Sequence, residues 1–294
     1  MNTLKDQHLE FFFEISIDLM CIAGVDGYFK RVNPAFTKVL GWSTEELLAK
    51  PFMEFVYPAD REHTVNEAGR LASGIDTVYF ENRYLKKDGS SAWLGWTCPA
   101  ATPENGLLYA VARDISEQKK TQEYLLQLAT YDSLTGLANR ALFLDEAVRA
   151  ASRCNRTHTG IAILYLDLDG FKPINDEFGH DVGDAVLREV AQRIASCIRD
   201  GDLAARLGGD EFAAILQASA AYPQTVAQRM IDAIAQPIAV HDCSCQLSVS
   251  IGLAIADVAP APDVIEQLVK CADKAMYDAK KSGGNRYVIY TSQS

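Results

Sequence analysis

The sequence predicts an α+β protein with two domains joined by a helical linker. Its 294 residues are enough for two domains with hydrophobic cores of ordinary size. The first 117 residues mix short strands with short helices, whereas helices and strands alternate from Tyr131 onward. A polar, helix-favouring stretch separates these two patterns. We therefore expect a first domain at residues 1–117, a linker at 118–130 and a second domain at 131–294.

The first domain is expected to contain two hairpins, each with an Asp-Gly pair at its turn. Residues 34–49 begin with Pro and carry Ser43 or Thr44 as a helix cap before two glutamates, so a helix is expected between the hairpins. The hairpins and a last strand are expected at residues 19–33, 77–100 and 107–116.

The linker is expected to be a helical connector. Its heptad-like positions span only about two heptads, which is too short to establish a coiled coil; they are Ile115, Gln122, Leu125 and Ala129.

In the second domain, the alternating pattern predicts helices that cover a central sheet. Residues 206–216, "RLGGDEFAAIL", read as a hairpin with Gly208 and Gly209 at its turn. The remaining helices are expected at 141–153, 184–198, 226–236 and 263–283, and the remaining strands at 159–171, 245–256 and 286–290.

Composition and charge exclude several classes of function. The net charge is −11, and the chain has neither a basic tail nor a polybasic stripe, so nucleic acids and anionic membranes are poor partners. No apolar run approaches the length of a membrane span, and the N-terminus does not resemble a signal peptide. The seven scattered cysteines are typical of reduced thiols, which predicts a cytoplasmic protein.

Cys243 and Cys245 lie close to His241, so a metal site is one interpretation of this group. Alternation along a single strand at 241–256 would instead put both thiols on one face as small packing residues, and this interpretation is favoured.

Two groups of acids are candidates for binding a cation. Asp210 and Glu211 directly follow the two glycines, and Asp167 and Asp169 end a buried apolar strand. Taken singly, a solvated acidic turn and a capped strand end explain them. Two such groups at the rim of one predicted sheet favour a shared cation, and oxygen ligands with few histidines indicate Mg²⁺. Carboxylate-bound Mg²⁺ commonly acts on a polyphosphate.

Five spaced motifs resemble the GGDEF domains of diguanylate cyclases. They are "DSLTGLANR" at 132–140, "DLDGFKPINDEFGHDVGD" at 167–184, "RLGGDEF" at 206–212, "SVSIG" at 248–252 and "ADKAMYDAKKSGGNR" at 272–286. The resemblance implies a nucleotidyl-cyclase-like fold, with a mostly antiparallel sheet surrounded by helices. It also implies condensation of two GTP molecules into cyclic di-GMP, with two Mg²⁺ or Mn²⁺ ions per GTP.

The resemblance also implies site residues. Asp167, Glu211, Asp210 and the carbonyl of Leu168 would bind the metal ions, and Asp210 and Glu211 would act in catalysis. The remaining implied residues would contact the substrate, either its triphosphate or its guanine or through the backbone of the two-glycine turn. They are Phe171, Lys172, Asn175, Asp184, Gly208, Gly209 and Lys280. Family members often carry Arg or Lys where this chain has Gly284, so a phosphate contact is either absent or replaced by Lys281 or Arg286.

Two further features concern specificity and feedback. A carboxylate at Asp184 can accept hydrogen bonds from guanine N1–H and N2–H₂, which favours guanine over adenine. Arg199 and Asp202 form an RxxD pattern that resembles the family's inhibitory product site; the simpler interpretation is a helix end followed by a turn. Arg229 is a weaker candidate to join that site from a neighbouring domain.

Residues 9–117 resemble a PAS sensor domain, an antiparallel sheet with flanking helices. The resemblance rests on "DGYFKRVNPAFTKVLGW" at 26–42, "KDGSSAWLGW" at 87–96 and "ARDISEQKK" at 112–120. Its ligand is unknown. His63 is the one candidate haem ligand, although a lone helical His is more often solvated. An apolar pocket could be lined by Trp93, Trp96, Phe52 and Phe55.

The sequence therefore favours a cyclase regulated by a sensor domain. The product has two-fold symmetry, so two half-sites are expected to face each other in a homodimer. The alternative is an inactive module that binds GTP or cyclic di-GMP without turnover.

Overall fold

The structure is a computed structural model that describes residues 2–99, 106–157, 159–219, 221–240, 243–256 and 265–291. The chain forms two compact units, Met1–Tyr124 and Leu125–Ser294. The division falls within helix α5 (Ser116–Thr130). None of the helices in the described ranges is both long and apolar enough to cross a bilayer.

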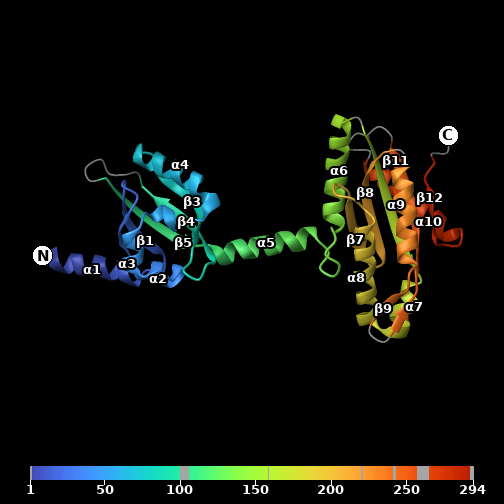
Figure 1. Ribbon diagram of the computed structural model, residues 1–294, viewed down its shortest axis with the longest axis horizontal. Coiled ribbons are helices and arrows are strands. Elements are labelled where there is room, and N and C mark those ends of the chain that lie inside the picture. Colours follow the sequence, from blue (N-terminus) through green and yellow to red (C-terminus); the bar gives the residue numbers. More distant parts are fainter. Residues whose placement is uncertain are drawn as a thin grey trace. The chain divides into compact units, whose positions relative to one another are not determined.

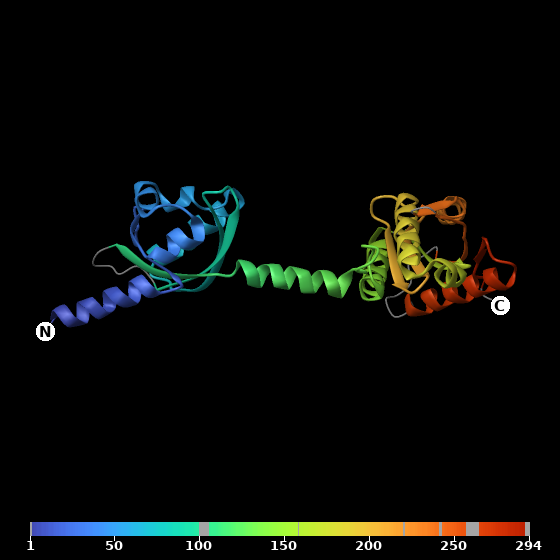
Figure 2. The same ribbon diagram turned by 90° about the horizontal axis from the view of Figure 1, so that it is seen from below.

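The first unit is a five-stranded antiparallel sheet with most of its helices on one face and the N-terminal helix, Asn2–Ile15, beside the other (Figures 1 and 2). The strand order is β2-β1-β5-β4-β3. Its strands are β1 (Leu19–Gly24), β2 (Phe29–Val32), β3 (Thr77–Leu85), β4 (Ser91–Cys98) and β5 (Leu107–Asp114). Its helices are α1 (Asn2–Ile15), α2 (Pro34–Leu40), α3 (Thr44–Ala49) and α4 (Arg61–Ala72), with short 3₁₀ turns at Phe52–Glu54 and Pro58–Asp60.

Local sequence explains the path of this unit. Gly27 and Gly89, with φ of 85° and 86°, allow the turns of both predicted hairpins. Ser43 caps α3: its hydroxyl accepts a hydrogen bond from the N–H of Glu46, whose carboxylate accepts one from the N–H of Ser43. The predicted antiparallel sheet with flanking helices is confirmed.

The second unit has a five-stranded sheet of order β12-β11-β6-β8-β7, in which only β11 and β12 are parallel. Its strands are β6 (Gly160–Asp169), β7 (Leu203–Gly208), β8 (Glu211–Ala218), β11 (Ser248–Ala256) and β12 (Arg286–Ile289), with a separate pair β9 (Ile238–Val240) and β10 (Cys243–Cys245). Its helices are α6 (Arg140–Thr157), α7 (Phe171–Phe178), α8 (His180–Ser196), α9 (Tyr222–Ile234) and α10 (Ile265–Lys281). The predicted mostly antiparallel sheet surrounded by helices is confirmed (Figure 1).

Alternation along the strands divides the core of this unit into two layers. Ile161, Ile163 and Tyr165 of β6 pack with residues of α6 and α10. Leu164 and Leu166 pack on the other face, with residues of α8 and α9. Continuing this alternation puts Asp167 on the face covered by α6 and α10.

The region around Cys243 and Cys245 differs from the prediction. Both cysteines lie on β10, which pairs with β9, whereas β11 begins at Ser248 and pairs with β6. The expected single strand at 241–256 was therefore wrong, because its two ends have different partners. Cys245 is buried and Cys243 is partly exposed; His241 lies outside the described residues.

Candidate functional site

The two glycines of the β7–β8 turn adopt conformations that favour glycine. Gly208 has φ of 142° and Gly209 has φ of 54°, values that residues with a Cβ seldom adopt. No atom of another part of the described chain lies within 4 Å of where a Cβ would stand on either glycine. The turn is therefore bare on its outer side, directly before Asp210 and Glu211.

Three elements bring charged side chains together beside this turn. Asp167 on β6 is the register partner of Glu211 on β8. In the last turn of α10, Lys280 places its Nζ 2.5 Å from Oδ1 of Asp167. The backbone also joins the strands here, because the N–H of Leu168 donates to the Asp210 carbonyl over 3.2 Å. We call Asp167, Asp210, Glu211 and Lys280 the acid cluster.

The pKa values within the acid cluster indicate an excess of negative charge. Burial raises the pKa of the Asp167 carboxyl; Lys280 opposes this shift, and Asp210 and Glu211 add to it. Burial lowers the pKa of the Lys280 ammonium, but Asp167 and its acidic neighbours hold that pKa above its ordinary value. The pKa of Asp167 is thus raised mainly by burial and further by its acidic neighbours, and the pKa of Lys280 is raised by the carboxylates around it, so an additional cation is favoured at this edge of the sheet.

Tyr165 supports Glu211 from inside the unit. Its hydroxyl donates a hydrogen bond to Oε2 of Glu211 over 3.0 Å. Burial and then the Glu211 carboxylate raise the pKa of Tyr165, so the hydroxyl remains a donor at neutral pH. We predicted no role for Tyr165 from the sequence; only its place two residues before Asp167, on the same strand face, could have indicated one.

Asp169 shares the strand face of Asp167, as predicted, but its oxygens already have partners. Ser250 donates to Oδ1 over 2.8 Å, and Oδ2 accepts from Ser248 over 3.0 Å and from the N–H of Asn285 over 3.1 Å. Gly284 has φ of 68°, and a Cβ on it would stand 2.9 Å from Oδ2 of Asp169. A side chain at position 284, where family members often carry Arg or Lys, would therefore crowd the Asp169 carboxylate in this structure.

Arg206 ties the bare turn to the beginning of the second unit. Its Nε and Nη2 donate to the Gly209 carbonyl over 3.0 and 2.8 Å. Its Nη1 donates to Oδ1 of Asp132 over 3.1 Å, and the same oxygen accepts hydrogen bonds from Thr135. We had no role for Arg206 or Asp132 beyond their motifs, since a contact 74 residues apart in the chain leaves no local signal.

Helices α7 and α8 carry the predicted base-reading residues, Asn175 and Asp184, and approach each other closely beside them. Oδ1 of Asn175 lies 1.8 Å from where a Cβ would stand on Gly183, so the missing side chain lets Asn175 reach α8. Asp184 follows Gly183 and is partly buried. At the start of α7, Phe171 is buried, which limits any ligand contact there to its backbone, while Lys172 is exposed.

The acid cluster fits a hard divalent cation by the chemistry of its donors. Oδ1 of Asp167 is buried, and although Nζ of Lys280 lies close to it, the pair is not aligned as a hydrogen bond. Carboxylate and carbonyl oxygens are the donors that Mg²⁺ prefers. Within the described ranges no three His, Cys, Asp or Glu side chains already converge on a metal position, so a bound polyphosphate would have to supply the remaining oxygens.

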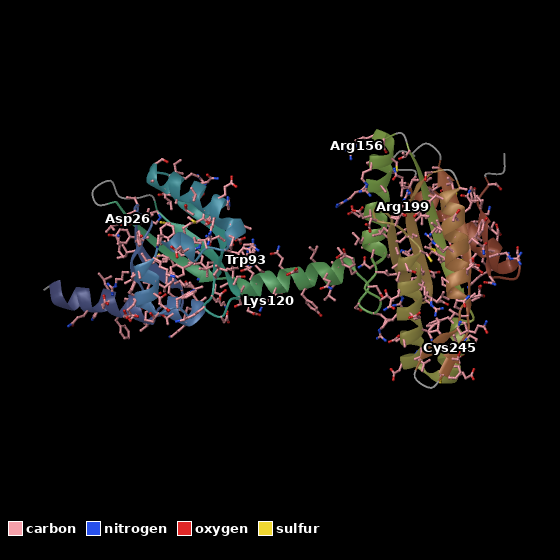
Figure 3. All side chains as sticks on the ribbon, in the orientation of Figure 1. Asp26, Trp93, Lys120, Arg156, Arg199 and Cys245 are labelled. Atoms are coloured by element: carbon pink, nitrogen blue, oxygen red, sulfur yellow. The ribbon has the colours of Figure 1, made fainter. Side chains whose placement is uncertain are left out.

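Arg199 and Asp202 lie between α8 and β7, at the opposite end of β7 from the two-glycine turn (Figure 3 labels Arg199). Nε of Arg199 is 3.7 Å from Oδ2 of Asp202, and the side chains are 47% and 1% exposed. Arg229 of α9 donates to the carbonyl of Cys197 at the end of α8.

The core of the first unit contains a cavity of about 90 Å³. Of the expected pocket residues, Phe52 and Trp96 line it, whereas Trp93 and Phe55 are not among its lining residues. Trp93 instead lies where the sheet meets α5 (Figure 3). Its backbone N–H donates a hydrogen bond to the hydroxyl of Ser116 over 2.9 Å. Because a cavity of ~150 Å³ holds only a benzene-sized molecule, this one is too small for haem or flavin.

His63 does not face that cavity. Its side chain is exposed, with the ring 4.9 Å from that of Phe80. The cavity wall instead carries the buried carboxylate of Glu67, which accepts hydrogen bonds from Thr77 over 2.5 Å and from Arg70 over 2.8 Å. His63 is therefore a surface residue in this structure.

Comparison with known proteins assigns both units to families. The family model described as "Diguanylate cyclase, GGDEF domain" matches residues 129–286, and the one described as "PAS fold" matches residues 29–112. The first match covers more than half of the chain.

Some curated relatives match about nine tenths of this chain and so span both units. Other relatives and the solved structures match mainly the second unit. The bifunctional diguanylate cyclase/cyclic di-GMP phosphodiesterase MucR of Pseudomonas aeruginosa is 40% identical over 57% of this chain and 24% of its own length. The diguanylate cyclase DgcS of Shewanella oneidensis is 37% identical over 58% of this chain and 56% of its own. The crystal structure of the coiled coil and GGDEF domain of DgcB from Caulobacter crescentus, in complex with c-di-GMP, is 31% identical, has a TM-score of 0.54 and covers 60% of this chain and 93% of that chain.

The chain spans 24% to 33% of the length of the first curated relatives it matches. Family membership rests on the matched residues themselves, which include the two-glycine turn, the acid cluster and the helices around them. The chain belongs to the GGDEF family of diguanylate cyclase domains and carries a PAS fold in its first unit.

Proposed function

We propose that the second unit condenses two GTP molecules into cyclic di-GMP. Each 3′-oxygen forms a bond to the α-phosphorus of the other nucleotide and loses its proton; the bond from that phosphorus to the bridging oxygen breaks, and pyrophosphate leaves. The observation that carries the proposal is the acid cluster directly beside a turn without side chains. Membership of the GGDEF family supports it.

Within this proposal, Asp167, Glu211, Asp210 and the carbonyl of Leu168 would hold Mg²⁺ or Mn²⁺, two ions per GTP. When bound, such ions stabilise charge on both the attacking and the leaving oxygen. Tyr165 keeps the Glu211 carboxylate in place through the hydrogen bond of 3.0 Å. Asp210 lies at the tip of the turn, next to the reacting 3′-hydroxyl.

The rest of the substrate meets chain elements that are free to receive it. Gly208 and Gly209 let the nucleotide approach the backbone closely, since no side chain intervenes. Lys280 pairs with Asp167 in this structure and is close enough to Asp167 to contact a phosphate bound there instead. Lys172 and the N–H groups at the start of α7, including that of Phe171, face the triphosphate in this proposal, because a helix N-terminus favours anions.

We further propose that the active unit is a homodimer, because the product has two-fold symmetry and each chain holds one GTP. The PAS unit is proposed to regulate synthesis in response to an unidentified ligand small enough for the cavity of about 90 Å³. Product feedback is assigned to Arg199 and Asp202. The seven cysteines, all of them described, are free thiols, which supports a cytoplasmic location.

Turnover separates an enzyme from a module that only binds nucleotide. The 294-residue chain incubated with GTP and Mg²⁺ should yield cyclic di-GMP and pyrophosphate in a ratio of one to two, as measured by chromatography and a pyrophosphate assay. Omitting the metal should stop both products. Binding of GTP without either product, at several protein concentrations, would support the binding module instead.

Asp184 is expected to select guanine. Asp184→Ser removes an acceptor matched to guanine N1–H and N2–H₂, and we expect discrimination between GTP and ATP, measured as the ratio of their kcat/KM values, to fall about tenfold or more. Asp181→Ser is the matched control, because Asp181 is an exposed acid in the first turn of the same helix. An unchanged ratio in the Asp184 variant would exclude this role.

A further inference from the structure

Asp202 is fully engaged within its own chain. Its Oδ2 accepts a hydrogen bond from the Tyr222 hydroxyl over 2.6 Å, and its Oδ1 accepts one from the N–H of Gln217 over 3.1 Å. Its side chain is only 1% exposed. A ligand from solvent therefore cannot reach this carboxylate while Tyr222 stays in place.

Tyr222 also covers Arg199, the other half of the pair. The guanidinium carbon of Arg199 lies 4.1 Å from the centre of the Tyr222 ring, in cation–π contact. Within the described residues, the other polar contacts of this guanidinium are with the Asp202 carboxylate at 3.7 Å and with the Gln217 carbonyl at 3.4 Å. One aromatic side chain thus contacts both members of the RxxD pair.

The chemistry of Tyr222 at this position resembles that of a guanine base. Guanine offers N–H donors to a carboxylate and a π surface to a guanidinium. The phenol offers one O–H donor to Asp202 and its ring to Arg199. Burial and then the Asp202 carboxylate raise the pKa of Tyr222, so the phenol keeps its proton at neutral pH.

We propose that Tyr222 is a built-in competitor of the product, occupying the RxxD site in place of a guanine of cyclic di-GMP. The inference rests on the proposed feedback function and adds a residue that sets its sensitivity. Tyr222 is the first residue of α9 and is partly exposed, so its side chain can turn away without breaking a helical hydrogen bond, although its ring then gives up contacts with the core of the second unit. Product binding then includes breaking the contact between Tyr222 and Asp202.

The direction of the expected effect is opposite to that of an ordinary binding residue. Tyr222→Phe keeps the ring over Arg199 but removes the hydroxyl, which leaves Asp202 short of a donor. Because hydrogen bonds to charged groups are among the stronger ones, we expect the Kd for cyclic di-GMP, measured by calorimetry on the full chain, to fall about tenfold. Arg199→Ala should abolish this binding in both backgrounds.

Tyr277→Phe is the matched control. Tyr277 is an exposed tyrosine of α10 that also carries a cation over its ring, Lys281 at 4.3 Å, and its variant should bind like wild type. If the Kd of Tyr222→Phe is unchanged or larger while binding still depends on Arg199, Tyr222 does not compete with the product, and the proposed feedback site is retained. If wild type shows no binding that depends on Arg199, feedback as proposed fails. In that case, competition by Tyr222 is supported only if the Tyr222→Phe variant binds cyclic di-GMP and the added Arg199→Ala change abolishes that binding.

Discussion

Glu211→Gln should reduce cyclic di-GMP synthesis by at least about a thousandfold. The amide keeps the shape of the side chain but removes the negative charge of an acid that would hold the cation beside the reacting phosphates. Loss of such charge stabilisation is worth several kcal/mol in a transition state, and each 1.36 kcal/mol is about tenfold in rate. Initial rates with GTP and Mg²⁺ measure the effect, and Asp210→Asn should behave in the same way.

Two measurements protect this result from trivial explanations. Glu266→Gln changes an exposed glutamate in the first turn of α10 and should keep wild-type activity. Thermal unfolding of the Glu211 and Asp210 variants should remain close to wild type, because both side chains are partly exposed and the amide of Gln can still accept the hydrogen bond from Tyr165. Substantial synthesis by both folded variants would show that these acids do not carry the chemistry.

Gly252→Ala should destabilise the second unit by about 3 kcal/mol or more. A Cβ on Gly252 would stand 1.9 Å from the Ala272 carbonyl oxygen and 2.2 Å from the Met276 nitrogen, both in the backbone of α10. Because a helix backbone cannot yield as a side-chain end does, α10 would have to leave β11. At a few degrees per kcal/mol, the midpoint of the second unit's thermal transition should fall by about 10 °C.

Gly69→Ala is the control for this second experiment. Gly69 lies within α4, and nothing lies within 4 Å of its added Cβ, so that variant should be neutral or slightly stabilised. Gly252→Ala protein that melts with wild type would mean that α10 is not held as closely against the sheet as the structure has it.

The fold was largely predictable because most of its helices and strands have recognisable patterns in the local sequence. The apolar run before Asp167, the Gly-Gly turn and the amphipathic stretch of α8 each carry their own periodicity. The strand at 241–256 was wrong because pairing partners decide where a strand ends, and local sequence does not name them. The short helix α7, directly after β6, was missed because eight residues that include Pro173 are too few to show a helical period.

The candidate site was less predictable from residue patterns alone. The acids were visible as acids, and the family resemblance supplied their expected roles, which remain untested predictions. The contacts of Tyr165, Arg206 and Tyr222 were not visible, because each joins positions far apart in the chain and depends on strand register and helix packing. Asp169 shows the converse: it is placed like Asp167 but is satisfied by two serines.

The alternation of β6 has a consequence for how such a chain can change in length over evolution. One residue gained or lost between Ile163 and Asp167 would turn the carboxylate toward α8 and α9, away from Glu211, without altering any single amino acid in the motif. A substitution on this strand can therefore weaken the site by a small or a large amount, whereas an insertion or deletion of an odd number of residues always moves the carboxylate to the other face. Insertions and deletions are expected to accumulate in surface loops, where adding one residue does not change which face a side chain occupies.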